Sequence, residues 1–240
     1  MPFHERKGSS MEKQLKLLEE AIKYHFKNQQ YLVRALTHSS YSNENKKEKP
    51  KNNERLEFLG DSVLGLVISE YLFSHYHQLE EGQLTKIRAK IVCEASLGEA
   101  SKVLKLGEYM LFGRGEELTG GRERMSILAD AFEALIAAIY LDGGMECVKT
   151  VVLGQLGSVI EAAVQGKLFV DYKTRLQEII QVQKGNRIKY EIIKEEGPDH
   201  AKVFHTEVRL NDEIIGVGSG SSKKESEQAA AKEGLKRFEG

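Results

Sequence analysis

The chain has 240 residues and a formal net charge of −1, with 40% hydrophobic and 30% charged residues. This composition is typical of a soluble globular protein with one large or two smaller domains, and it gives no global basic signal for nucleic acid. No run of about 18 apolar residues is present, so we expect no membrane span. Residues 1–10 lack the apolar segment of a secretory signal, and we expect them to be a disordered start.

The two cysteines, Cys93 and Cys147, lie far apart in the sequence and form no C-x-x-C motif. A disulfide scaffold and a zinc site are therefore not expected. This pattern is typical of the cytoplasm. We predict a cytoplasmic protein with no membrane partner and no small-molecule cofactor.

Residues 11–165 are predicted to form an all-α domain. Leu15, Leu18 and Ile22 have helical spacing, which predicts a helix over 11–23. A second helix is expected from Tyr31. The remaining expected segments are a polar, lysine-rich loop over 42–53, a helix entered at Glu80 and ending near Leu106, a Gly-rich charged loop over 112–123, and a helix over 148–164.

The segment after Asn53 is an apolar helix that carries three acids. Glu54, Glu57 and Asp61 lie at positions i, i+3 and i+7, so a helix places them on one face. Apolar residues cover most of the remaining circumference, which predicts a buried helix capped by Asn52 or Asn53. Because a buried carboxylate without a partner is costly, we expect a cation beside these acids.

A second apolar helix, over 126–141, repeats the pattern with Asp130 and Glu133. Ser126 is the expected N-cap, and Gly143–Gly144 the expected stop. If the two helices pack together, their acids form an all-oxygen cluster, which suits Mg²⁺ or Mn²⁺ rather than zinc. Acids at this spacing usually mark a solvated face, but the apolar flanks and the repetition favour a metal site.

After a linker over 166–170, the pattern changes to a small α+β domain over 171–240. A helix is predicted over 171–182, period-two strands over 189–195, 204–210 and 214–217, and a final helix over 222–238. The expected order is α-β-β-β-α. The prediction for the whole chain is therefore a multi-domain protein, all-α at the N-terminus and α+β at the C-terminus.

The start of the last helix suggests a site for an anion. Ser222 and Glu225 form a capping-box pattern, and Lys223 and Lys224 lie in the first turn, where the helix dipole disfavours cations. Lysines beside free backbone N–H groups can bind phosphate, and the glycines of 216–221 would let the backbone approach a ligand. Residues 171–240 contain 13 basic and 13 acidic residues, so any basic surface must come from clustering. An ordinary solvated helix start is the alternative.

Taken together, these motifs resemble those of bacterial ribonuclease III, a double-stranded-RNA endonuclease, from about Leu15 to Phe238. The matching segments of the first domain are Leu36–Ser40, Asn53–Asp61, Glu81–Thr85 and Ser126–Leu135. The second domain resembles a double-stranded-RNA-binding domain through Thr174–Glu178, Gly197–His200 and Ser222–Glu225.

The resemblance implies roles for individual residues. Asp61 and Glu133 would be catalytic, and together with Glu57 and Asp130 they would bind metal, with Glu54 and Glu81 at the periphery. Phe58 would insert into the partner subunit of a homodimer. The residues implied in RNA binding are Thr174, Gln177, Glu178, Gly197, Pro198, His200, Ser222, Lys223 and Lys224.

The implied activity is metal-dependent hydrolysis of double-stranded RNA that leaves 5′-phosphate and 3′-hydroxyl ends with short 3′ overhangs. The expected cofactor is Mg²⁺, with Mn²⁺ as a substitute, and it would activate water and stabilise the leaving 3′ oxygen. The expected substrates are precursors of ribosomal, messenger and transfer RNA.

Other features have more than one interpretation. We interpret His38 as a structural histidine, whereas a role in holding phosphate is open for Arg122 and Arg124. The alternative functions are a double-stranded-RNA-binding regulator that does not cut and a phosphohydrolase for small esters. The second does not explain the C-terminal domain.

Overall fold

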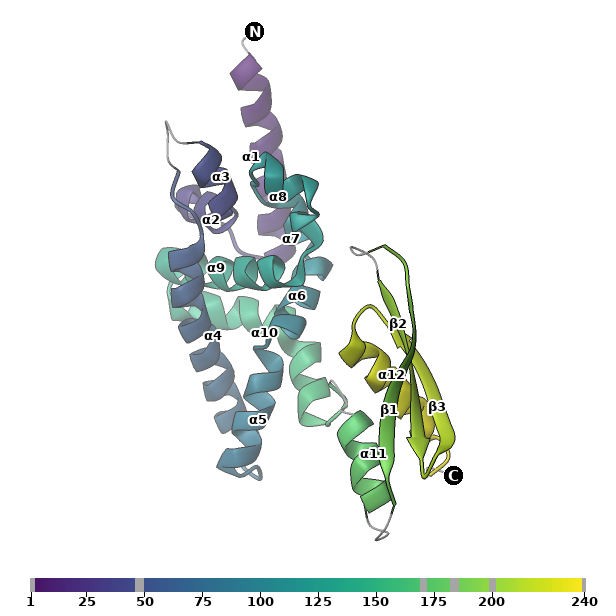
Figure 1. The fold of residues 1–240 in the computed structure, drawn as a ribbon. Helices are drawn as coiled ribbons and strands as arrows, with labels where there is room; N and C mark the ends of the chain where they lie inside the picture. Colours follow the sequence, from purple (N-terminus) through teal and green to yellow (C-terminus); the bar gives the residue numbers. More distant parts are fainter. Residues whose placement is uncertain (1–2, 46–49, 169–171, 182–185, 199–201, 239–240) are drawn as a thin grey trace. The chain divides into compact units, whose positions relative to one another are not determined.

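The computed structural model describes residues 3–45, 50–168, 172–181, 186–198 and 202–238 (Figure 1). The chain divides into two compact units, residues 1–168 and 169–240, and each has its own hydrophobic core. The described part of the first unit is helical, and the second has the order helix, three antiparallel strands, helix. The predicted fold class is confirmed.

The described helices of the first unit are α1 (Phe3–Ile22), α2 (Gln29–Ala35), α3 (Ser39–Glu44), α4 (Glu54–His75), α5 (Glu81–Ile91), α6 (Glu94–Val103), α7 (Leu106–Tyr109), α8 (Arg114–Leu118), the 3₁₀ turn η1 (Gly121–Glu123), α9 (Met125–Gly143) and α10 (Met145–Val164). Helix α1 therefore begins at Phe3, so the disorder expected before Met11 is not found over residues 3–10.

Helix α9 is the centre of the first unit. Most of its side chains are buried, including Phe132, Leu135 and Ile139, and helices α2, α4, α6 and α10 pack around it. An apolar sequence over the whole circumference is typical of a helix covered on all sides. The helix ends where Gly144 adopts a positive φ of 81°, as the sequence predicted.

Helices α4 and α9 approach each other closely at Gly60. A Cβ atom on Gly60 would lie 1.9 Å from the carbonyl oxygen of Glu133, well inside contact distance. Glycine is therefore required for the backbones to meet here. The close approach sets the separation of the two helices at the level of their acids.

Several predicted boundaries in the first unit differ from the structure. The helix expected to run from Glu80 to Leu106 is interrupted at Val92–Cys93, where the Ser96 hydroxyl donates to the carbonyl oxygen of Lys90 at 2.7 Å. Short helix α8 lies within the loop predicted over 112–123, and the end of α3 extends into the loop predicted over 42–53. The N-cap of α9 is Arg124 rather than Ser126. Local hydrogen bonds and tertiary packing, which periodicity does not report, fix these boundaries.

Helix α10 is long and apolar enough to cross a membrane by length and composition. It is the only such helix among the described residues, whereas no segment of this length and hydropathy was expected from the sequence. Its Val148, Val152, Leu156 and Ile160 are buried in the core of the first unit. One face of α10 therefore packs into the core of the first unit.

The second unit contains α11 (Tyr172–Gln181), β1 (Ile188–Glu196), β2 (Val203–Leu210), β3 (Glu213–Gly220) and α12 (Lys223–Leu235), with strand order β1-β2-β3. Its core joins Leu176 and Ile180 of α11, Val208 and Ile215 of the sheet, and Leu235 of α12.

Glycines on β3 allow α12 to lie directly on the sheet. A Cβ on Gly216 would lie 2.5 Å from the carbonyl oxygen of Ala230, and one on Gly218 would lie 2.1 Å from the backbone nitrogen of Ala230. The glycine-rich stretch was expected to bring backbone close to a ligand. Within the described residues, it brings strand and helix together instead.

We predict that Gly60→Ala destabilises the protein by about 1–3 kcal/mol, because the added methyl group must push α4 away from α9. Thermal unfolding would show a decrease in Tm. Gly154→Ala in α10 is the matched control, since nothing lies within 4 Å of its Cβ position, and there the gain in helix propensity should leave Tm unchanged or raise it. Equal effects of the two substitutions would contradict the close-approach argument.

Candidate metal centre and nucleic-acid interface

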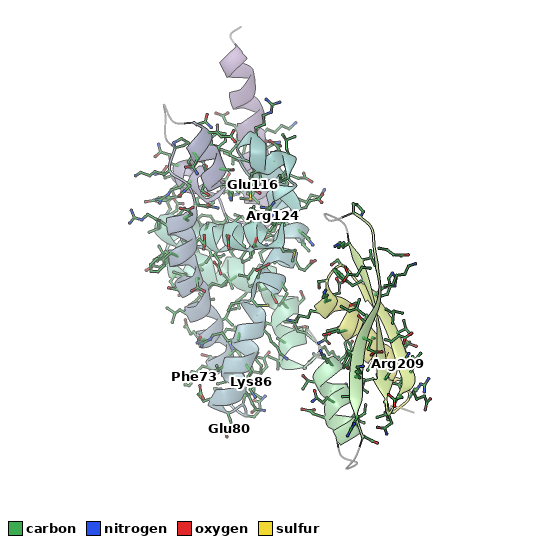
Figure 2. All side chains as sticks on the ribbon, viewed as in Figure 1. Phe73, Glu80, Lys86, Glu116, Arg124 and Arg209 are labelled. Atoms are coloured by element: carbon green, nitrogen blue, oxygen red, sulfur yellow. The ribbon has the colours of Figure 1, made fainter. Side chains whose placement is uncertain are left out.

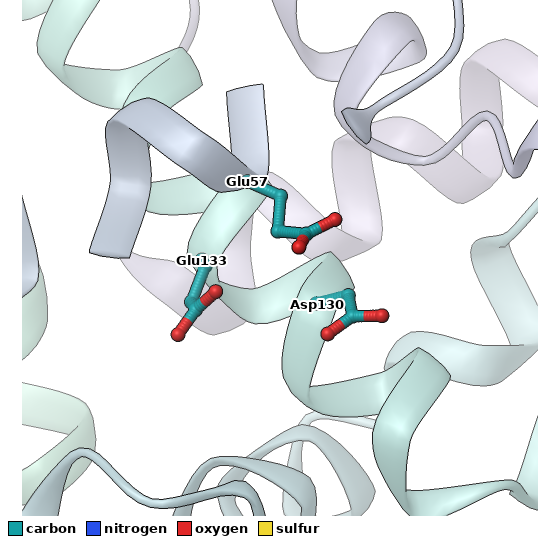
Figure 3. A group of neighbouring side chains, drawn as sticks. All are labelled: Glu57, Asp130 and Glu133. Atoms are coloured by element: carbon teal, nitrogen blue, oxygen red, sulfur yellow. The ribbon is translucent and has the colours of Figure 1, made fainter. Parts of the chain in front are cut away.

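Three carboxylates from two helices meet at the contact between α4 and α9. One oxygen from each of Glu57, Asp130 and Glu133 lies within 4.8 Å of the others, and all three residues are half-buried (Figure 3). Glu57 comes from the first turn of α4, while Asp130 and Glu133 lie one helical turn apart on α9. The predicted meeting of the two acidic helices is confirmed for these residues.

The importance of Gly60 was not predicted from the sequence. This glycine lies between Glu57 and Asp61 on α4 and brings that turn against the backbone of Glu133. A signal was present, because glycine inside an apolar helix costs about 1 kcal/mol relative to alanine and usually has a packing reason.

The environment of the cluster favours protonated carboxyls. Burial raises the pKa of Glu133 from 4.5 to about 8, with further contributions from the neighbouring carboxylates of Asp61, Asp130 and Glu57. The pKa of Glu57 is raised mainly by burial and next by the carboxylate of Asp130. The pKa of Asp130 is raised mainly by burial and next by the carboxylate of Glu94. Like charges in a partly desolvated site oppose ionisation of one another.

Asp61 and Glu54 lie at the edge of this cluster. Both side chains are exposed, and neither belongs to the group of three whose oxygens converge. Asp61 nevertheless raises the pKa of both Glu133 and Glu57, and Glu54 raises that of Glu57. Both acids therefore act electrostatically on the cluster.

Glu81 is not near the cluster within a single chain. It lines a hollow together with Leu72 and Phe73 at the C-terminal end of α4, and its carboxylate accepts a hydrogen bond from the Thr85 hydroxyl at 2.9 Å. Glu57 precedes Leu72 by 15 residues on α4, which is about 22 Å along a helix axis. Phe73 and Glu80, which are labelled in Figure 2, mark this end of α4 and the start of α5. The peripheral position expected for Glu81 is therefore not found within one chain.

His38 has a structural role, in agreement with our interpretation. It is the N-cap of α3, and its Nδ1 accepts a hydrogen bond from the backbone N–H of Ser40 at 3.3 Å. Its backbone N–H donates to the carbonyl oxygen of Leu111 at 3.1 Å. His38 also lowers the pKa of Asp130, against the larger effect of burial.

Both arginines before α9 are engaged inside the first unit. Nε and Nη2 of Arg122 donate to Glu117, and its Nη1 donates to the carbonyl oxygens of Gly107 and Met110. Arg124 pairs with Glu116 at 2.5 Å, and both residues are labelled in Figure 2. These contacts hold the segment leading into α9.

The predicted RNA-binding residues of the second unit lie on exposed surfaces. Thr174, Gln177 and Glu178 share the face of α11 opposite the buried Leu176 and Ile180. Gly197 has a φ of 92° at the end of β1, and Pro198 follows it. His200 lies outside the described residues.

The cap of α12 differs in part from the predicted capping box. The Ser222 hydroxyl accepts from the N–H of Glu225 at 3.2 Å, as expected. The Glu225 carboxylate, however, accepts from the N–H and hydroxyl of Ser221 rather than from Ser222. Lys223 and Lys224 are exposed in the first turn, and Nζ of Lys223 lies 3.7 Å from a carboxylate oxygen of Glu195.

Comparison with known proteins identifies both units. Residues 28–159 match the "Ribonuclease-III-like" family model, and residues 172–237 match the "Double-stranded RNA binding motif" model. A protein named Ribonuclease 3 from Caldanaerobacter subterraneus is 54% identical over 93% of this chain and 98% of its own length. The chain belongs to the ribonuclease III family.

Other members of the ribonuclease III family agree with this assignment. Ribonuclease 3 from Clostridium tetani is 54% identical over 94% of this chain and 95% of its own length. The nuclease domain of ribonuclease III from Campylobacter jejuni matches with a TM-score of 0.56 and 44% identity, over 60% of this chain and 96% of that one.

Enzymes of the ribonuclease III family depend on metal, and the chemistry of the cluster fits a hard cation. Its donors are all carboxylate oxygens, which Mg²⁺ and Mn²⁺ prefer. Among the described residues, no lysine or arginine forms an ion pair with Glu57, Asp130 or Glu133. A divalent ion would supply the positive charge that the protein does not provide.

We predict that, in the presence of a chelator, the free energy of unfolding decreases as the pH rises from about 4.5 to 8. Over this range unfolded Glu133 is ionised, whereas folded Glu133 retains its proton. Glu133→Gln removes this titration. At pH 8 its Tm should exceed that of the wild type by at least about 2 °C, since 1 kcal/mol corresponds to roughly 2–4 °C at this size.

The control for this measurement is Glu99→Gln. Glu99 is exposed and pairs with Lys102 on α6, so its removal should preserve the wild-type pH dependence. If Glu133→Gln and the wild type showed parallel pH profiles, the proton would not be held by Glu133.

Proposed function

We propose that this protein is a metal-dependent endoribonuclease that cleaves double-stranded RNA. The single observation that carries this proposal is the convergence of Glu57, Asp130 and Glu133 at the contact of α4 with α9. Membership in the ribonuclease III family and the double-stranded RNA binding motif of the second unit support the choice of substrate. A regulator that only binds RNA would not need this costly cluster of carboxylates.

In this proposal Glu57, Asp130 and Glu133 hold Mg²⁺, with Mn²⁺ as a substitute, and Asp61 completes the set from the exposed edge. The ion, when bound, supplies Lewis-acid activation of water and stabilises charge on the phosphate and the leaving oxygen. The raised pKa of Glu133 means that binding a divalent ion must displace a proton at neutral pH. Cleavage should therefore become weaker as the pH falls.

The products expected from hydrolysis at the 3′ oxygen are a 5′-phosphate and a 3′-hydroxyl, with short 3′ overhangs where both strands are cut. The second unit would bind A-form RNA by shape, with α11 and the turn at Gly197–Pro198 in the minor groove and Lys223 and Lys224 on phosphate. Precursors of ribosomal, messenger and transfer RNA in the cytoplasm are the proposed natural substrates.

We infer that the enzyme acts as a homodimer through α4. Phe58 is 80% exposed, Leu66 56% and Phe73 73%, and their spacing places them on one side of the helix. A hollow of about 350 Å³, lined in part by Leu66, Leu72, Phe73 and Leu84, lies at the C-terminal end of that side. Exposed apolar surface of this kind marks an interface.

A two-fold axis between two copies of the chain would bury both the exposed Phe58 and the apolar hollow. Phe58 lies near the N-terminal end of α4 and the hollow lies at the other end, so antiparallel α4 helices would place each Phe58 in the opposite hollow. The partner subunit's Glu81, which lines that hollow, would then lie near the turn carrying Glu54 and Glu57. This arrangement gives Glu81 the peripheral position that it lacks within one chain.

For activity, we predict that Glu133→Gln binds duplex RNA with near wild-type affinity but loses at least about 100-fold in cleavage, because it removes a metal ligand from the centre of the cluster. The measurement is single-turnover cleavage of a labelled duplex with Mg²⁺, together with a binding titration. Glu99→Gln should cleave as the wild type does. Wild-type cleavage by Glu133→Gln would remove this residue from the catalytic set.

For assembly, we predict that Phe58→Asp yields a monomer of 27.0 kDa, because a carboxylate cannot enter an apolar hollow without a large desolvation cost. Light scattering would measure the mass. The control is Leu118→Asp on α8, which is 77% exposed and lies outside the α4 stripe. A wild-type protein that is itself monomeric, or a dimeric Phe58→Asp variant, would contradict this interface.

A further inference from the structure

A polar hollow of about 580 Å³ lies between α2 and the segment that precedes α4. Arg34, Lys51, Asn28, Gln29 and Gln30 line it, and none of the described residues that line it is acidic. Two other hollows of the first unit include carboxylates, from Glu70 and Glu81 in one and from Glu108 and Glu123 in the other. The hollow beside Arg34 therefore has the charge and hydrogen-bonding character that suits an anion.

Arg34 is held in place in this hollow. It is half-buried, and its Nε donates to the backbone carbonyl of Asn52 at 3.1 Å. This bond fixes the plane of the guanidinium, and the structure gives its terminal Nη groups no partner among the described residues. Lys51 is exposed at the rim and likewise pairs with no described carboxylate. Two positive charges are thus available to a ligand.

The hollow adjoins the acidic cluster along the chain. Asn53, the N-cap of α4, donates its backbone N–H to the carbonyl oxygen of Thr37, which lines the hollow. Glu54 and Glu57 lie in the turn that begins at the next residue. The wall of the hollow therefore leads directly into the turn of α4 that contributes a carboxylate to the cluster.

We propose that the hollow beside Arg34 binds the sugar–phosphate backbone of the duplex RNA, next to the phosphodiester that is cut. A planar guanidinium with free Nη groups matches the oxygens of a phosphate, and a lysine adds a point charge. Asparagine and glutamine amides suit ribose hydroxyls and phosphate oxygens. The site gives the catalytic unit its own RNA contact, and it rests on the function proposed above.

Lys51→Gln in the full-length protein tests this proposal, because an exposed side chain without described partners can be replaced without loss of folding. Binding to a long duplex RNA is measured with chelator present at several salt concentrations. Losing one phosphate contact should reduce the magnitude of the slope of log affinity against log salt by about 0.9, equivalent to about 3.5-fold between 50 and 200 mM. Lys51→Glu should have a larger effect.

The matched control is Lys16→Gln on α1, which removes the same charge from an exposed position of the first unit. Arg34→Lys is the second test, because lysine keeps the positive charge but lacks the planar guanidinium with its paired N–H donors. This variant should bind RNA more weakly with little change in the salt slope. Equal slopes for Lys51→Gln and the wild type would overturn the proposal. Equal effects of Lys16→Gln and Lys51→Gln on the salt slope would also overturn the proposal, because they would indicate a general electrostatic attraction to RNA rather than a contact in the hollow.

Measuring RNA cleavage distinguishes a failure of this proposal from a failure of the proposed function. Lys51→Gln should retain wild-type kcat with Mg²⁺ at saturating RNA and show only a higher KM. If no variant and no wild-type protein cuts RNA, the proposed function fails. If the wild type and the variants all cleave RNA with equal KM, the proposed function stands and the RNA contact at the hollow beside Arg34 is overturned. A change of oligomeric state in Lys51→Glu without any effect on RNA would assign the hollow to a protein contact and overturn the proposal.

Discussion

The close approach of α4 and α9 at Gly60 is the constraint on which the functional site depends. Because residue 60 has no side chain, the turn of α4 that carries Glu57 rests on the backbone of Glu133. Glu57 is thereby held with Asp130 and Glu133. The buried surface of α9 makes this arrangement rigid, since its remaining side chains are fixed by contacts with α2, α6 and α10. The acids are therefore positioned by the core itself rather than by a loop.

This arrangement works against the stability of the protein without metal. Burial, with added repulsion from neighbouring acids, raises the pKa of each of the three half-buried carboxyls, and that of Glu133 reaches about 8. The burial of the apolar core must offset that repulsion. A divalent ion would remove the repulsion, and its binding would then couple stability to function. The same reasoning explains why none of the described lysines and arginines pairs with these acids, since a basic side chain would occupy the position that a cation needs.

Much of the architecture could be predicted from the sequence, because periodicity reports burial. The alternation of the strands and the acids at Glu57, Asp130 and Glu133 were sufficient to predict the sheet and the cluster. The break at Cys93, the short helices α3 and α8 and the true N-cap of α9 were not, because single hydrogen bonds between residues of low helical signal decide them. The distance of Glu81 from the cluster could not be predicted for another reason: a matching motif does not report how far its residues lie from those of another motif in the same chain.

The glycines of β3 show how one sequence signal can support two physical explanations. Glycine allows any close approach, and the sequence does not say whether a ligand or a helix is the neighbour. Gly216 and Gly218 meet the backbone of α12, so they position the helix whose first turn carries Lys223 and Lys224. Their effect on RNA would then be indirect, through the orientation of that turn. Gly60 follows the same logic in the first unit, where a missing side chain sets the position of charged groups on the neighbouring turn. In both units, glycines fix the backbone next to the turn that carries the charged residues.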